Sequence, residues 1–177
     1  MPEPAPEIGQ ATKDDIAGIL QLQDANHLDR GGLLSMHFPH EWFEARLNDT
    51  PVIVARRGGR IVAYLITSSI EAQSSAGIVQ AMLSAYSHSP NAYIYGPVCV
   101  AADERGQGLA SALFADLLTR VPNRECFTFI RGDNTASLRA HAKMGMRTVA
   151  TFTLGDMDYV VVAYGAYPIG TLSPPTL

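Results

Sequence analysis

The sequence predicts an α/β protein: a mixed β-sheet of about seven strands with helices on its faces, and an extra helix between the third and fourth strands. Three patterns indicate this class. β-rich runs alternate along the chain with stretches whose apolar residues recur at helical spacing. A Gly-Gly turn joins two β-rich runs as a hairpin, and a Gly-Asp turn joins the last two runs.

The N-terminal part begins with a short first strand over residues 7–12. The capping signal Thr12-Lys-Asp-Asp15 then predicts a helix that ends near His27. Residues 29–38 are typical of a loop, and Pro39 suits the first turn of a second helix.

The middle of the chain predicts a hairpin, a helix and a further strand. The hairpin strands are 51–55 and 61–67, and an amphipathic helix follows over residues 76–87. The strand at 93–100 contains Gly96-Pro97. Because proline removes a ladder donor, this pair predicts a bulge or an interrupted edge.

The C-terminal part predicts two helices and three strands. A helix runs from about Leu109 to Val121, and a strand covers 126–130. Asp133-Asn134 caps a short helix that ends at Gly145. The final strands are 147–154 and 157–166.

Length and composition predict one domain over residues 1–177, with loose termini at 1–6 and 168–177. Hydrophobic residues make up 47% and charged residues 17%. The formal net charge is −4 and no run of Lys or Arg occurs, so no nucleic-acid partner is expected. Any anionic ligand must therefore be held by local geometry.

Several features predict a cytoplasmic protein. Cys99 and Cys126 lie in apolar, strand-like runs and are interpreted as buried thiols in a reducing compartment. The N-terminus is acidic and proline-rich, unlike a signal peptide. No apolar run approaches the roughly 20 residues of a membrane span, so no membrane partner is expected. The sequence leaves the oligomeric state open, a homodimer included.

The start of the helix at Leu109 lacks a capping side chain. Gly106 and Gly108 precede it, and Asp103 lies too far upstream to cap it. Uncapped N–H groups and the helix dipole form an anion site, and glycines let a ligand approach the backbone. The stretch 105–110 is therefore predicted to cradle a phosphate or pyrophosphate.

Other phosphate motifs fit this stretch less well. The P-loop pattern G-x-x-x-x-G-K-[ST] is absent. A Rossmann fingerprint needs G-x-G-x-x-G directly after its strand, whereas Gly106-x-Gly108-x-x-Ser111 has two of the three glycines and lies past the strand. A plain glycine-containing loop is the remaining alternative.

Two motifs resemble the GNAT N-acetyltransferase superfamily. Arg105-x-x-Gly108-x-Ala110 is similar to its Q/R-x-x-G-x-G/A signature. The stretch Asn134–Met146 resembles the second motif, N-x-x-A/S-x-x-F-Y-x-K-x-G-F. The resemblance covers residues 92–165 and extends over 7–91 by element order alone.

The resemblance implies an enzyme that uses acetyl-CoA as co-substrate. The pyrophosphate would sit on the amides of 105–111, the pantetheine arm would pair with the backbone of 98–100, and one face of the short helix would look toward the sulfur. The implied cofactor-binding residues are Val98, Cys99, Val100, Arg105, Gly106, Gln107, Gly108, Leu109, Ala110, Ser111, Asn134 and Ser137.

The implied reaction is direct attack of a primary amine, on a small molecule or a peptide, on the thioester. His141 stands where the family usually has a tyrosine proton donor. We expect it either to protonate the leaving thiolate or to pack against pantetheine. Tyr95 is the second catalytic candidate, on a strand that lacks the glutamate many relatives carry. These departures keep open an alternative, a catalytically weak or inactive acyl-CoA-binding regulatory protein.

The family's acceptor pocket corresponds here to the first two helices and their loop, His27–Arg30 through His37–Trp42. His37-x-x-His40-Glu41 has a metal-like spacing. Pro39 separates the histidines and no third ligand is evident, so no metal is predicted.

Overall fold

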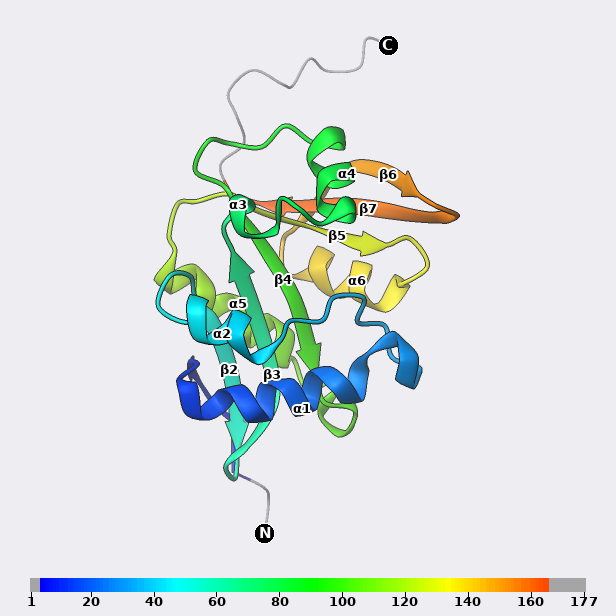
Figure 1. The fold of residues 1–177 in the computed structure, drawn as a ribbon. Helices are drawn as coiled ribbons and strands as arrows, with labels where there is room; N and C mark the ends of the chain where they lie inside the picture. The colour runs from blue at the N-terminus through cyan, green and yellow to red at the C-terminus, as the bar shows by residue number, and fades with distance from the viewer. Residues whose placement is uncertain (1–3, 166–177) are drawn as a thin grey trace. The chain divides into compact units, whose positions relative to one another are not determined.

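The computed structural model describes residues 4–165, which form seven strands and six α-helices (Figure 1). The strands are β1 (Glu7–Gln10), β2 (Val52–Arg57), β3 (Arg60–Ser68), β4 (Tyr93–Val100), β5 (Cys126–Arg131), β6 (Arg147–Leu154) and β7 (Met157–Tyr164). The helices are α1 (Ile16–Asn26), α2 (His40–Arg46), α3 (Ile70–Gln73), α4 (Gly77–Ala85), α5 (Leu109–Arg120) and α6 (Thr135–Lys143). Short 3-10 turns cover Lys13–Asp15, Leu28–Arg30 and Ala102–Glu104.

The described chain divides into two compact units. The first comprises the chain up to Ser68 together with Tyr95–Pro122, and the second comprises Ser69–Ile94 together with the chain from Asn123. Hydrogen-bonded neighbours follow the order β1-β2-β3-β4-β5-β7-β6, so the predicted mixed α/β class with seven strands is confirmed. Strand β4 begins in the second unit and ends in the first.

One detail differs from the sequence prediction, and one is confirmed. Between β3 and β4 there are two helices, α3 and α4, where one was expected. Helix α3 has four residues, too few to show a period, and its start is set by the Ser69 hydroxyl, which accepts a bond from Ala72 N at 3.2 Å. Strand β4 runs through Gly96-Pro97, whose peptide bond is cis, but its parallel pairing with β5 covers only Tyr93 and Ile94, so the predicted interrupted edge is confirmed. Residues 1–3 and 168–177 of the expected loose termini lie outside the described residues.

In the first unit, helices cover both faces of β2 and β3. Val52 and Val54 belong to a core with Ile16 and Ile19 of α1. Because side chains alternate along a strand, Ile53 points to the other face, where α5 packs on β2 and β3. Figure 1 shows α1 in front of these strands and α5 behind them.

The start of α1 is held to the sheet by an ion pair. Thr12 N and Thr12 Oγ1 both donate to Asp15 Oδ2, at 2.7 and 3.0 Å, which confirms the predicted capping signal. Arg56 of β2 donates to both oxygens of Asp15, at 2.8 Å from Nε and 2.5 Å from Nη2. The Arg56 hydrogen bond lowers the pKa of Asp15.

The second unit packs helix α4 on one face of β5, β7 and β6. Val79 and Met82 of α4 share a core with Phe127 of β5. The carboxylate of Glu125, fully buried just before β5, accepts hydrogen bonds from Ser89 N at 2.9 Å and from the Tyr86 hydroxyl at 2.8 Å. It thereby anchors the end of the α3–α4 segment. Figure 1 shows α6 on the side of these strands opposite α4.

The Asp15–Arg56 pair predicts acid sensitivity of the fold. A carboxyl with a lowered native pKa stabilises the fold above the unfolded pKa, and this contribution disappears as pH falls below about 4. Asp15→Asn should lower the free energy of unfolding by about 1–3 kcal/mol at neutral pH. The difference between wild type and variant, measured by urea denaturation, should shrink toward pH 3. Parallel stability curves from pH 7 to 3 would contradict this assignment.

Candidate active site

Helix α5 begins without a side chain over its N-terminus. Its N-cap residue is Gly108, with φ of 78°, and Gly106 two residues earlier has φ of 79°. No side-chain hydrogen bond caps Gly108, and the first turn contains no acidic residue. The first main-chain N–H groups of a helix have no acceptor within it, and the helix dipole adds partial positive charge there. This 12-residue helix therefore offers donors to an anion.

The two glycines leave open space beside these donors. A Cβ atom built on Gly106 or on Gly108 meets no atom within 4 Å. Both φ angles lie in the left-handed region, where a side chain is strained. Glycine is thus needed for the backbone path and leaves the main chain open to close approach.

The side chains of this loop are bonded to neighbouring elements. Arg105 Nη2 donates to Asn26 Oδ1 at the end of α1, at 2.7 Å, and Arg105 Nε donates to Val100 O at 3.4 Å. Gln107 Oε1 accepts from Arg57 Nη2 of β2 at 3.3 Å. These bonds tie the loop to the end of α1 and to β2.

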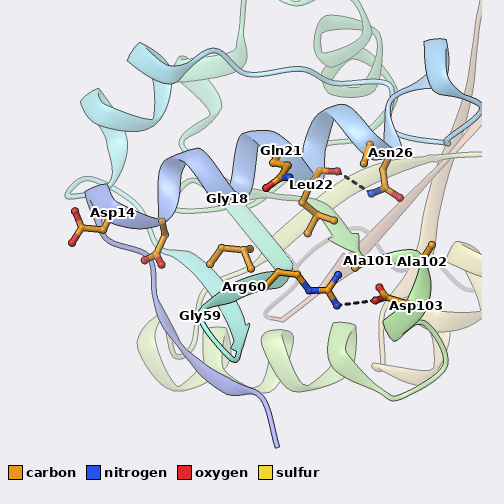
Figure 2. Close-up of a pocket in the computed structure, with 13 residues that line it drawn as sticks. Asp14, Gly18, Gln21, Leu22, Asn26, Gly59, Arg60, Ala101, Ala102 and Asp103 are labelled. Carbon is orange, nitrogen blue, oxygen red and sulfur yellow. Dashed lines mark hydrogen bonds and ion pairs between the residues drawn. The ribbon is translucent and has the colours of Figure 1, made fainter. Parts of the chain in front are cut away.

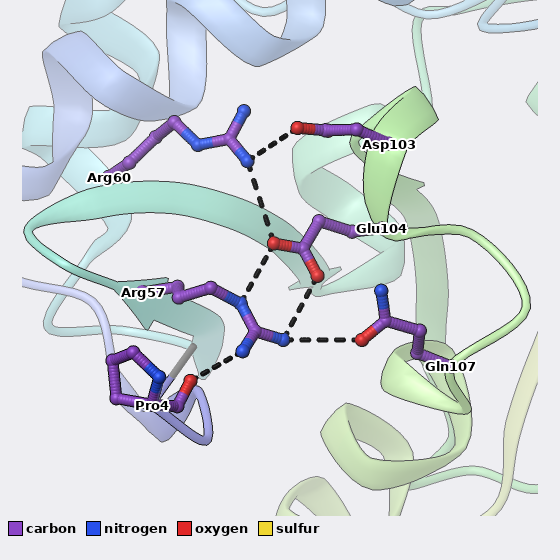
Figure 3. A network of polar contacts seen from close by, with 6 residues as sticks. All are labelled: Pro4, Arg57, Arg60, Asp103, Glu104 and Gln107. Atoms are coloured by element: carbon purple, nitrogen blue, oxygen red, sulfur yellow. Dashed lines mark hydrogen bonds and ion pairs between the residues drawn. The ribbon is translucent and has the colours of Figure 1, made fainter. Parts of the chain in front are cut away.

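A charged network lies at the start of the loop (Figure 3). Glu104 accepts from Arg57 Nε at 2.8 Å and from Arg57 Nη2 at 3.0 Å, and its side chain is only 4% exposed. Arg60 Nη2 donates to Asp103 at 2.8 Å and lies 3.5 Å from Glu104 Oε1. The Arg60 hydrogen bond lowers the pKa of Asp103.

Helix α6 of the second unit carries the other predicted site residues. Asn134 is its N-cap, as predicted, and its Oδ1 accepts from Ser137 N at 3.2 Å. His141 lies one turn further on and is 7% exposed. Its Nδ1 lies 2.7 Å from Ser137 O and 3.3 Å from Ser137 Oγ.

The bond to Ser137 O determines the tautomer of His141. A carbonyl oxygen only accepts, so Nδ1 must carry the proton. In the neutral ring the lone pair is then on Nε2. Burial lowers the pKa of His141, which favours this neutral form.

The model of the Acetyltransferase (GNAT) family matches residues 17–146. The chain belongs to this family. It is an acetyl-CoA-dependent acyltransferase, as the two motifs predicted. A comparison with curated protein sequences finds no match.

Solved structures of acetyltransferases share the fold. An N-acetyltransferase from Staphylococcus aureus Mu50 has TM-score 0.69 and 21% identity over 92% of this chain and 99% of its own. Ribosomal-protein-alanine N-acetyltransferase from Brucella melitensis has TM-score 0.68 and 22% identity over 90% and 99%. The structure of yncA from Salmonella typhimurium, solved with its cofactor acetyl-CoA, has TM-score 0.67 and 20% identity over 98% and 99%.

The glycine loop of the acetyltransferase fits the diphosphate of acetyl-CoA. It combines uncapped main-chain donors with empty space where a Cβ would stand. On β4, Val98 and Val100 are partly exposed, whereas the Cys99 side chain is buried in the core that contains α1. Burial raises the pKa of Cys99 to about 11 and that of Cys126 to about 12, so both thiols stay protonated and poorly nucleophilic.

The ring of Tyr95 packs against α5. Its ring is fully buried and lies edge-to-face with Phe114 of α5, with centroids 5.4 Å apart. The catalytic assignments of Tyr95 and His141 stay predictions.

The predicted acceptor loop of the acetyltransferase is held firmly to α1. The buried Gln23 amide donates to Phe38 O at 2.9 Å and accepts from Phe38 N at 3.0 Å. The Phe38 and Trp42 rings then pack at 4.2 Å. His37 Nε2 lies 3.0 Å from Asp24 Oδ1.

A cavity of about 410 Å³ lies in the first unit, between α1, the β2–β3 turn and the residues after β4 (Figure 2). Its lining residues are Asp14, Asp15, Gly18, Gln21, Leu22, Ala25, Asn26, Gly59, Arg60, Ile61, Ala101, Ala102 and Asp103. The loop predicted to hold the acceptor does not line it.

Sequence reasoning missed the residues that support the glycine loop. Arg57 and Asn26 meet this loop only in the tertiary structure, since Arg57 is 47 positions from its partner Glu104 and Asn26 is 79 positions from its partner Arg105. The sequence signal that could have revealed Arg57 is the charged pair Arg56-Arg57 at the end of an apolar strand.

Among residues 4–165, no group of three or more His, Cys, Asp or Glu side chains is arranged to hold a metal ion. No described helix is long and apolar enough to cross a membrane.

The open space at Gly108 predicts a selective loss of binding. Gly108→Ala should weaken acetyl-CoA binding about tenfold or more, because a Cβ would occupy the approach to the main-chain donors. Isothermal titration calorimetry measures this. Gly155→Ala is the matched control, because Gly155 has φ of 62° and also has no atom within 4 Å of a Cβ. Equal affinities of Gly108→Ala and wild type would contradict the cradle.

Proposed function

We propose that this acetyltransferase transfers the acetyl group of acetyl-CoA to a primary amine of a small molecule or peptide by direct attack. The observation that carries the proposal is the uncapped, glycine-lined N-terminus of α5. Acetyl-CoA supplies the activated thioester carbonyl. The buried, protonated thiols of Cys99 and Cys126 argue against an acyl group carried on the protein, and they suit a reducing, cytoplasmic compartment.

Binding of the cofactor is assigned to main-chain groups and one helix face. The amides of 105–111 hold the diphosphate. The backbone of Val98–Val100 is assigned to the pantetheine arm. In the second unit, Asn134 and Ser137 of α6 are assigned to the cofactor because of the family resemblance. The tethers of Arg105 and Gln107 support this arrangement, because they keep the loop in one conformation.

His141 is assigned to proton transfer at Nε2. A primary amine with a pKa near 10 must lose a proton to attack and complete the transfer. The Nδ1–H bond to Ser137 O orients the ring and leaves Nε2 as the accepting atom. The imidazolium can then return the proton to the leaving sulfur. In this scheme His141 first accepts a proton from the amine and then donates it to the sulfur. The sequence predicted only the second step, protonation of the leaving thiolate.

A structural neighbour suggests which acceptor amine to test first. One structural neighbour is named for acetylation of a ribosomal-protein alanine, which makes a peptide N-terminus a reasonable first acceptor.

Thiol release tests the proposed activity. Wild-type protein with acetyl-CoA and a panel of small primary amines and alanine-initiated peptides should release free CoA thiol in an amine-dependent manner, with the acetylated product seen by mass spectrometry. Gly108→Ala serves as the low-binding control. Acetyl-CoA binding without turnover on any amine would instead support a regulatory acyl-CoA-binding protein, and absence of binding would reject both.

His141 predicts a pH-dependent loss in kcat. His141→Phe should lower kcat about tenfold or more and leave acetyl-CoA affinity within a few-fold. Because burial lowers the pKa of His141, the acid limb of wild-type kcat/KM should lie below pH 6.5 and disappear in the variant.

His141→Tyr separates the two directions of proton transfer. A tyrosine can donate at neutral pH but is a poor proton acceptor there. Full activity of His141→Tyr beside an inactive His141→Phe would show that a donor suffices at this position, against proton acceptance by His141. Wild-type rates in His141→Phe across pH 6–9 would make His141 a packing residue.

A further inference from the structure

Glu104 is a buried carboxylate immediately before the glycine loop. It is 3% exposed, and Arg57 donates to both of its oxygens, at 2.8 and 3.0 Å. Arg60 is the second cation in contact, at 3.5 Å, but its side chain is 53% exposed. Arg57 is therefore the main compensating charge, since its own side chain is only 12% exposed.

Arg57 also reaches the loop itself. The nitrogen Nη2 that contacts Glu104 lies 3.3 Å from Gln107 Oε1, and Nη1 donates to Pro4 O. Gln107 stands between Gly106 and Gly108. One planar guanidinium thus joins β2, the residue before the loop and the residue between its two glycines (Figure 3).

This position gives Arg57 two effects on an anion at the start of α5. It holds the residue before the loop and the residue between the two glycines, so the main-chain donors are arranged before a ligand arrives. It also neutralises a buried negative charge close to the donors. Without Arg57, Glu104 would oppose the positive end of the helix and repel a phosphate.

We propose that Arg57, through Glu104 and Gln107, is a positioning residue for the diphosphate-binding loop of this acetyltransferase. The inference rests on the proposed function, because it takes the diphosphate of acetyl-CoA as the bound anion. Arg57 acts through the loop and through the charge of Glu104, and its guanidinium is not itself assigned to the phosphate.

Two acetyl donors and a double-mutant cycle test this role. S-acetylpantetheine lacks the diphosphate, so it reports on the rest of the site. Arg57→Gln should lower kcat/KM for acetyl-CoA about tenfold or more and change that for S-acetylpantetheine less than about threefold. Calorimetric Kd values for acetyl-CoA should rise by the same factor.

Removal of the buried charge should restore binding. The double variant Arg57→Gln/Glu104→Gln should recover acetyl-CoA affinity to within about threefold of wild type, because no unpaired carboxylate remains. Arg57→Lys keeps the charge but not the planar fork, and should lie between wild type and Arg57→Gln. If Arg57→Gln fails to fold, the acetyl-CoA affinities of these two variants still test whether Arg57 positions the loop.

Arg56→Gln is the matched control. Arg56 is the preceding residue of β2 and also pairs with a buried carboxylate, Asp15. Its loss should lower the melting temperature and leave the Kd for acetyl-CoA unchanged.

Several outcomes would overturn the proposal. Unchanged acetyl-CoA affinity in Arg57→Gln, or equal losses with both donors, would make the pair a purely structural one. A double variant as weak as Arg57→Gln, alongside tighter binding by Glu104→Gln, would show that Arg57 contacts the phosphate directly. Wild-type protein without affinity for acetyl-CoA would overturn the proposed function as well, which separates the two failures.

Discussion

The unpaired main-chain N–H groups at the start of α5 are the constraint on which the rest of the site depends. A helix in water tolerates such groups, but a binding site must keep them ordered and unblocked. Gly106 and Gly108 provide the left-handed turn and the open space. Arg105, bonded to α1, and Arg57, bonded to Glu104 and Gln107, hold that turn in place.

Buried polar groups elsewhere in the chain are paired in the same specific way. Asp15 meets Arg56 and the capping residue of α1, and Glu125 is surrounded by the donors of Tyr86 and Ser89. These contacts join segments far apart in sequence. Because each carboxylate is buried, loss of its partners would leave a costly uncompensated charge. In helix α6 a hydrogen bond acts on a neutral ring in a similar way, because the Ser137 carbonyl selects the tautomer of His141.

The element order was predictable because periodicity, capping and turn residues are local signals. The helix at 109–120, its missing cap and the N-cap at Asn134 all follow from neighbouring residues. Helix α3 was missed because four residues show no period. The glycine loop was found from its composition, whereas its supports were not, since Arg57 and Asn26 carry no motif that marks them.

The sequence by itself determined the family, the α/β order and the loop that should meet the cofactor, because motif spacing and hydrophobic periodicity are properties of the chain. Only the tertiary structure decided which partners the charged residues take. It placed Arg105 on Asn26, buried Glu104 beside Arg57, and turned Nδ1 of His141 to the Ser137 carbonyl. The reason is physical: protonation, tautomer and charge compensation depend on burial and distance, and a sequence states neither.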